Sequence, residues 1–99
     1  MAVVPMVVAV RRNEHGDVTD VRMGYADTQT NAWTPGGEPT TAPVLRVVDA
    51  LMASDTVCTR MPNGSSGPGL RVVEAKVGRG VETIESDDPD RPVASFEQF

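Results

Sequence analysis

The clearest local signal in this sequence is TAPVLRVVDALM, the stretch at residues 41–52. Its apolar side chains recur at the i, i+3, i+4 and i+7 positions of one helical face, as Val44, Val47, Val48 and Leu51. Thr41 can cap the helix, and Pro43 suits its first turn, where the missing N–H costs nothing. We therefore expect an amphipathic helix with one buried face, which Leu45 and Met52 widen.

Strand-like segments lie on both sides of this helix. Residues 6–10 are apolar at both parities, which is typical of a strand covered on both faces, and residues 19–25 alternate apolar and polar side chains. After the helix, strands are expected at residues 56–59, 70–77 and 81–84. The order β-β-α-β-β-β predicts a small α+β fold, with an antiparallel sheet of about five strands and the helix packed on one face. We expect residues 1–99 to form a single domain.

The composition excludes several classes of function. The 99 residues carry 9 Lys and Arg against 14 Asp and Glu, a net charge of −5. A nucleic-acid backbone is bound through a surplus of cations, so no direct nucleic-acid partner is expected. One Cys and one His cannot build a multi-cysteine zinc site. We therefore expect neither a cofactor nor a metal.

Three weak catalytic or ligand-binding motifs are set aside. His15 and Cys58 could act as base and nucleophile, but two suitable residue types are little evidence, and the burial of Cys58 stays open. The carboxylates at residues 87–90 lack the spacing of a calcium loop. The glycine-rich residues 64–69 lead into a strand, whereas a phosphate-binding loop leads into a helix. We expect a protein that is not an enzyme and has no catalytic residues.

The negative charge gathers at one end of the chain. Residues 1–80 carry eight acidic and eight basic side chains, so the whole excess belongs to residues 81–99. Val93, Phe96 and Phe99 recur every third position there, so this acidic segment is expected to pack on the domain, and its aromatics belong either to the core or to an interface. A solvated surface that aids solubility is the simpler interpretation. The functional interpretation is a partner-binding surface formed by Glu82, Glu85, Asp87, Asp88 and Asp90.

Trp33 is the sixth candidate for partner binding. It is the only Trp, and it lies within residues 27–41, a long segment without a sustained period. Such a Trp either anchors the loop in the core or forms an exposed interface residue.

The N-terminal apolar run does not have the order of a secretory signal. Arg11 and Arg12 follow residues 2–10, whereas a signal peptide places its positive charge first. The run is also shorter than the roughly 20 residues that span a bilayer. We expect a cytoplasmic protein with no membrane partner.

Several segments that together span nearly the whole chain follow a characteristic order. They are VAVRR at 8–12, VTDVR at 18–22, Trp33, the helix at 44–52, VCT at 57–59, LRVV at 70–73, and the spaced Val93, Phe96 and Phe99. In this order they resemble a family of short bacterial proteins known only as a domain of unknown function. Cys58 stands where the family often has an aromatic residue, and the Asn-Leu and Leu-Pro pairs usual near its terminus are missing. The resemblance implies a fold and no established activity.

Two functions remain compatible with these features of the sequence. The first is a non-enzymatic protein-binding module, of the immunity or antitoxin type, whose acidic surface engages a basic partner such as a nuclease toxin. The alternative is a small-ligand-binding or housekeeping domain, with a pocket framed by residues 27–41 and 61–69 and lined by Trp33 and Tyr25.

Overall fold

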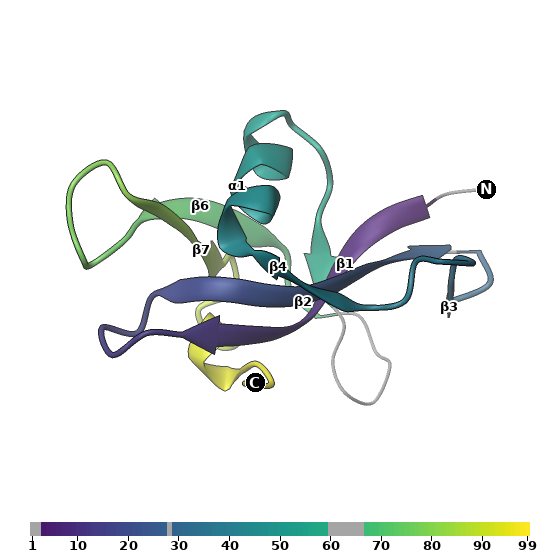
Figure 1. The fold of residues 1–99 in the computed structure, drawn as a ribbon, viewed down its shortest axis with the longest axis horizontal. Helices are drawn as coiled ribbons and strands as arrows, with labels where there is room; N and C mark the ends of the chain where they lie inside the picture. The colour runs from purple at the N-terminus through teal and green to yellow at the C-terminus, as the bar shows by residue number, and fades with distance from the viewer. Residues whose placement is uncertain (1–2, 28, 60–66) are drawn as a thin grey trace.

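Strands dominate the computed structural model, which describes residues 3–27, 29–59 and 67–99 (Figure 1). In chain order the elements are β1 (Val3–Arg12), β2 (Val18–Asp27), β3 (Ala32–Trp33), β4 (Thr40–Pro43), α1 (Val44–Met52), β5 (Cys58–Thr59), β6 (Leu70–Glu74), β7 (Glu82–Ser86) and the short 3-10 helix η1 (Val93–Ser95). Among the described residues, no helix has the length and apolar character needed to cross a lipid bilayer.

The main sheet is built around β1 and confirms the predicted fold class. The strand order is β3-β2-β1-β5, and β4 also pairs with β2, so the sheet has five strands. Its long antiparallel pair runs from Val3 opposite Asp27 to Arg12 opposite Val18. Val7 and Val10 are at most 1% exposed, as expected for a central strand. One helix packed with a mostly antiparallel sheet gives the strand-rich α+β fold that the sequence predicts.

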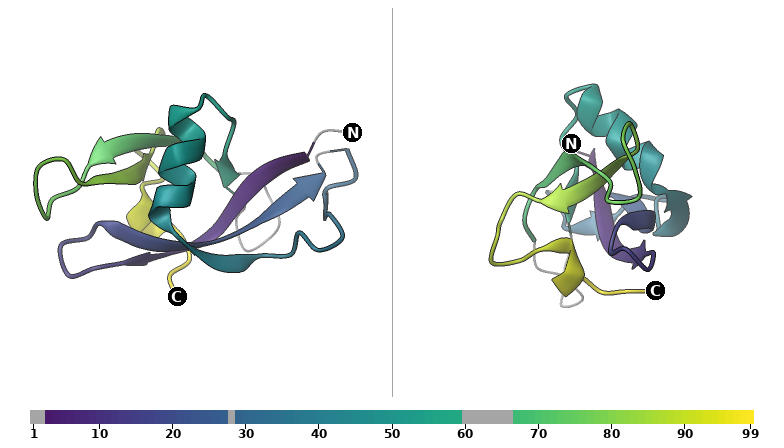
Figure 2. Two further views of the ribbon diagram at one scale, coloured as in Figure 1. Left: turned by 45° about the horizontal axis from the view of Figure 1, so that its top comes forward. Right: turned by 90° about the vertical axis from the view of Figure 1, so that its left-hand side faces the viewer.

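Two features of the sheet differ from an all-antiparallel arrangement. β5 pairs with β1 in parallel, with Met6 opposite Cys58. β6 and β7 pair only with each other and form a separate two-stranded sheet. Figures 1 and 2 show this β6–β7 hairpin projecting beside α1, at one end of the long β1–β2 pair.

α1 begins later than the sequence predicts. Residues Thr40–Pro43 pair with β2 as β4, so Pro43 rather than Thr41 occupies the N-cap position, and no side chain caps the helix. Val44, Val47 and Val48 are buried as predicted. Leu45 and Met52 are 56% and 66% exposed, so the prediction that they widen the buried face is wrong. The helix contacts β6, β7 and β2 through its narrower valine face.

The C-terminal residues return to the main sheet. Val93 and Phe96 belong to the hydrophobic core. Val10 N–H donates to the Glu97 carbonyl at 2.9 Å, and Phe99 N–H donates to the Val10 carbonyl at 3.2 Å. The Arg11 guanidinium lies 4.6 Å from the centre of the half-buried Phe99 ring. Phe96 is therefore a core residue, and Phe99 covers the edge of β1.

Candidate functional site

The β6–β7 hairpin is fastened to the start of β2 by a buried carboxylate. Asp17 is 6% exposed, and its two oxygens accept the backbone N–H groups of Lys76 at 2.9 Å and Val77 at 3.2 Å. Nearby, the buried Thr83 hydroxyl donates to the Val18 carbonyl at 2.8 Å. These contacts join residues about 60 positions apart in the chain, so they fix where the hairpin sits relative to the main sheet.

Two acidic residues face each other across this hairpin. Glu74 lies directly opposite Glu82, and both are exposed. The adjacent pair is hydrogen-bonded, because Ala75 N–H donates to the Val81 carbonyl at 2.7 Å. The two types of pair alternate along an antiparallel hairpin, so Glu74 and Glu82 form a non-hydrogen-bonded pair, the type in which the side chains are closer together. Like charges directly opposite each other destabilise a sheet. Neither residue belongs to an ion pair with the described residues, so no cation in that part of the chain offsets this repulsion.

The acidic surface continues beyond β7. Asp87 and Asp90 are exposed, and neither takes part in an ion pair within residues 3–27, 29–59 and 67–99. Together with the hairpin pair they follow β7 from its first residue to the turn beyond its last. We call this set the acidic edge, and it consists of Glu74, Glu82, Asp87 and Asp90.

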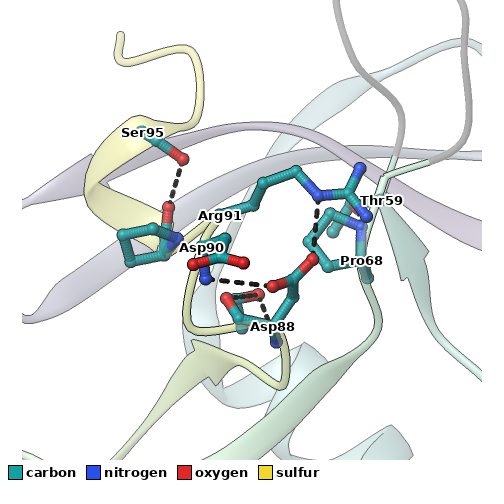
Figure 3. A network of polar contacts seen from close by, with 8 residues as sticks. Thr59, Pro68, Asp88, Asp90, Arg91 and Ser95 are labelled. Atoms are coloured by element: carbon teal, nitrogen blue, oxygen red, sulfur yellow. Dashed lines mark hydrogen bonds and ion pairs between the residues drawn. The ribbon is translucent and has the colours of Figure 1, made fainter.

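The carboxylates of Glu85 and Asp88 are engaged inside the chain. One oxygen of the half-buried Glu85 accepts the backbone N–H groups of Ser86 and Val93, each at 2.8 Å, which ties β7 to η1. Figure 3 shows the Asp88 carboxylate between the Arg91 side chain and the backbone of Asp90. Its oxygens accept Arg91 Nε–H and Asp90 N–H, both at 3.0 Å. Both carboxylates therefore hold the C-terminal turn together.

Asp88 gives the turn a measurable pH dependence. The hydrogen bond from the Asp90 backbone, followed by the one from the Arg91 side chain, holds the pKa of the Asp88 carboxyl below its ordinary value of 3.8. A lowered pKa in the folded state stabilises the protein above 3.8, and this contribution is lost as the pH falls through the lower, folded-state pKa.

We therefore expect Asp88→Asn to be less stable than the wild type at neutral pH and equally stable once the pH lies below the folded-state pKa of Asp88. Urea unfolding at neutral pH and at an acidic pH well below 3.8 measures how far the difference narrows. Glu38→Gln is the control, because the exposed Glu38 carboxylate takes part in no hydrogen bond or ion pair with the described residues. A stability difference between wild type and Asp88→Asn that is the same at both pH values would contradict this account.

Trp33 lies far from the acidic edge. It is half-buried in β3 and pairs with Ala26 near the end of β2, whereas β7 is fastened at Val18, where β2 begins. These two points of β2 are eight residues apart, roughly 26 Å of strand. Figure 1 places β3 and the β6–β7 hairpin toward opposite ends of the longest axis. One small contact surface therefore cannot centre on both Trp33 and Glu82.

The two residues of the weak catalytic pair are also apart. His15 lies in the exposed turn between β1 and β2, 3.6 Å from Glu14. Cys58 is half-buried in β5 opposite Met6, and six residues of β1, roughly 20 Å, separate Met6 from the turn. No group of three or more His, Cys, Asp or Glu side chains within the described ranges is placed to hold a metal ion.

A cleft of about 440 Å³ opens where the hairpin meets the main sheet and the start of α1. Two of its lining residues are charged, and both are acids, Asp17 and Glu82. The remainder are mostly apolar or small. The full lining is Asn13, Asp17, Val18, Thr19, Val44, Leu45, Ala75, Val77, Gly80, Val81, Glu82 and Thr83.

A second cleft, of about 410 Å³, involves Tyr25. It is lined by Val3, Val4, Pro5, Met23, Tyr25, Arg46, Ala50, Asp55 and Thr56, which come from β1, β2 and the region of α1. Trp33 is not among them. Most of the segment 61–69 lies outside the described residues, so the pocket expected between residues 27–41 and 61–69 stays a prediction.

Two residues of the candidate site were not predicted from the sequence. Glu74 lies outside the acidic segment 81–99, and only the register of the hairpin shows that it faces Glu82. A turn at residues 78–80 between the two predicted strands indicates the hairpin, but it would set Glu74 opposite Ile84 and so does not give the observed pair. Asp17 lies between the first two predicted strands, and nothing in the sequence connects it to Lys76 and Val77.

No family model, curated protein or solved structure matches this chain. The resemblance to the bacterial domain of unknown function therefore stays a prediction.

Proposed function

We propose that this protein is a non-enzymatic binding module whose acidic edge recruits a basic protein partner. The observation that carries the proposal is the Glu74–Glu82 pair. Two carboxylates directly opposite each other in a hairpin cost stability, and the described part of the chain offers them no cation. A cationic partner would relieve this repulsion on binding. The exposed Asp87 and Asp90 extend the same negative charge along the strand.

The structure also suggests how the charge would act. Exposed carboxylates contribute mainly to long-range attraction, which raises the rate of association more than the lifetime of the complex. Glu85 and Asp88 contribute to the negative field, although their oxygens are already engaged by the C-terminal turn. The acidic edge therefore consists of the carboxylates that a partner can pair with directly.

The class of partner follows from the same chemistry. A nuclease is basic where it holds phosphate, so an acidic surface can occupy or block that groove. We therefore propose an immunity or antitoxin type of inhibitor, acting on a nuclease toxin in the bacterial cytoplasm. This finer assignment rests on the charge distribution.

The test uses the purified product of the gene directly upstream, the position in which a toxin would be expected. Glu82→Gln, Asp87→Asn and Asp90→Asn are combined in one variant. Because the carboxylates steer the encounter, its association rate with the upstream gene product is expected to fall by about tenfold or more at low salt. Stopped-flow mixing or surface plasmon resonance measures this rate.

A matched variant controls for the change in total charge. Glu38→Gln, Asp49→Asn and Asp55→Asn also remove three exposed carboxylates, all outside the acidic edge. This control is expected to change the association rate by less than about threefold, since steering depends on charge close to the contact. Equal rates for the two variants, or an upstream gene product that does not bind, would overturn the proposed function.

A further inference from the structure

Three exposed hydrophobic side chains converge on the 440 Å³ cleft. Leu45 of α1 is 56% exposed, and Val77 and Val81, on either side of the hairpin turn, are each 47% exposed. Single exposed apolar side chains are ordinary on protein surfaces. Here the helix and the hairpin turn together contribute three, which line one concave site with the buried Val44 and Val18, and a ligand can use such a feature.

The charges around the cleft favour a cationic neighbour. Asp17 and Glu82 are its charged lining residues, and the Asp17 oxygens are already engaged by two backbone N–H groups. Glu82, beside Glu74, remains available to a cation. Three cations are close to the cleft in sequence or space, but none of them lines it: Arg12 and Lys76, whose charged ends lie beside Gly16, and Arg79 of the hairpin turn. An anionic ligand would therefore find no lining side chain to neutralise it.

We propose that this cleft receives an apolar side chain of the basic partner, with a neighbouring Lys or Arg of that partner pairing with Glu82. The inference rests on the proposed function and names its central contact. Interface energy usually comes from a few apolar anchors desolvated in a pocket, while charges at the rim steer the approach. Leu45, Val77 and Val81 form such a pocket, and Glu82 lies within the same lining.

The first experiment selects ligands from a displayed library of random short peptides against the full chain. We expect a consensus with one aliphatic or aromatic residue beside a Lys or Arg. A consensus with acidic flanks, an apolar consensus without cations, or no consensus would overturn the inference. The selected peptide is then synthesised and used as the probe, and its Kd is measured by fluorescence anisotropy.

Variants then locate the peptide on the surface. The double variant Leu45→Gln, Val81→Thr removes two exposed cleft side chains and is expected to weaken peptide binding by about tenfold or more, as loss of an anchor pocket does. Met52→Gln is the matched control, because Met52 is 66% exposed on the same helix and does not line the cleft. It is expected to change Kd by less than about twofold. Circular dichroism and the urea midpoint show that both variants fold. Equal effects of the double variant and Met52→Gln would overturn the inference.

The upstream gene product separates a failure of this inference from a failure of the proposed function. If that protein binds with an association rate that depends on the acidic edge, but Leu45→Gln, Val81→Thr leaves its Kd unchanged, the cleft is not the anchor and the proposed function stands. If the protein does not bind at all, the proposed function fails, and the peptide experiment decides the chemistry of the cleft on its own.

Discussion

Replacing Gly24 by Ala is expected to destabilise the native protein by about 3 kcal/mol, at the upper end of the usual cost of overpacking. Gly24 is buried in β2, where the segment from Thr34 to Pro39 crosses it. An added Cβ would overlap the Gly37 carbonyl oxygen and lie 2.9 Å from the Pro39 nitrogen. Both are backbone atoms, and the Gly37 carbonyl is held by Tyr25 N–H at 2.8 Å, so neither can move away cheaply. Urea unfolding measures the loss.

Gly78→Ala is the control for this prediction. A Cβ at Gly78 would meet nothing within 4 Å, and its backbone is not in the left-handed region. We expect a stability change within about 0.5 kcal/mol, as for most surface substitutions. If Gly24→Ala lost no more stability than Gly78→Ala, the close placement of residues 34–39 over β2 would be contradicted.

Replacing Asp17 by Ala is the second change with a large expected effect, about 3 kcal/mol of lost stability. Two backbone hydrogen bonds to a buried carboxylate disappear, and each bond to a charged group contributes roughly 1.5–3 kcal/mol. The N–H groups of Lys76 and Val77 would lose their acceptor where the hairpin joins the sheet. We therefore expect the protection of the Val77 amide against hydrogen exchange to fall more than that of amides in β1.

Asp27→Ala provides the comparison for Asp17. Among the described residues, the Asp27 carboxylate accepts one exposed hydrogen bond, from Gln29 N–H at 2.9 Å. Its replacement is expected to cost less than about 1 kcal/mol, because water can take the place of an exposed acceptor. An Asp17→Ala protein that kept both its stability and the protection of the Val77 amide would show that the hairpin is held by other contacts.

The role of Asp17 in holding the β6–β7 hairpin links the fold to the proposed function. The hairpin it fastens carries Val77, Val81 and Glu82, which line the cleft. Asp17→Ala is therefore expected to weaken binding of the upstream gene product as well as stability, because the hairpin loses its fixed position.

Local patterns predicted the elements whose burial follows a simple period. The valines of α1 identify its buried face because they repeat at helical spacing. β1 was recognisable as a central strand because both of its faces are apolar. The remaining elements were determined by strand pairing between residues distant in the sequence. Thr40–Pro43 became a strand because β2 offers it a partner, and this shortened the helix that Thr41 was expected to cap. β3, two residues long, shows no period at all.

The candidate site was predictable as a concentration of charge but not as a set of contacts. Counting charges located the acidic segment without showing which carboxylates are engaged. Glu85 became a support for η1 only because the chain turns back on itself after β7. Glu74 joined the acidic edge through strand register, and the cleft formed from α1, β2 and the hairpin. Each of these depends on residues distant in sequence, which no local pattern encodes.

The central claim, recruitment of a basic protein by the acidic edge, is tested most directly by the salt dependence of association. The association rate constant of the wild-type chain with the upstream gene product is measured from about 0.01 M to about 0.5 M salt. We predict a fall of at least about tenfold across this range for the wild type, and a clearly shallower fall for the variant that combines Glu82→Gln, Asp87→Asn and Asp90→Asn. An association rate that does not change with salt, or an equally steep dependence in wild type and variant, would contradict the claim.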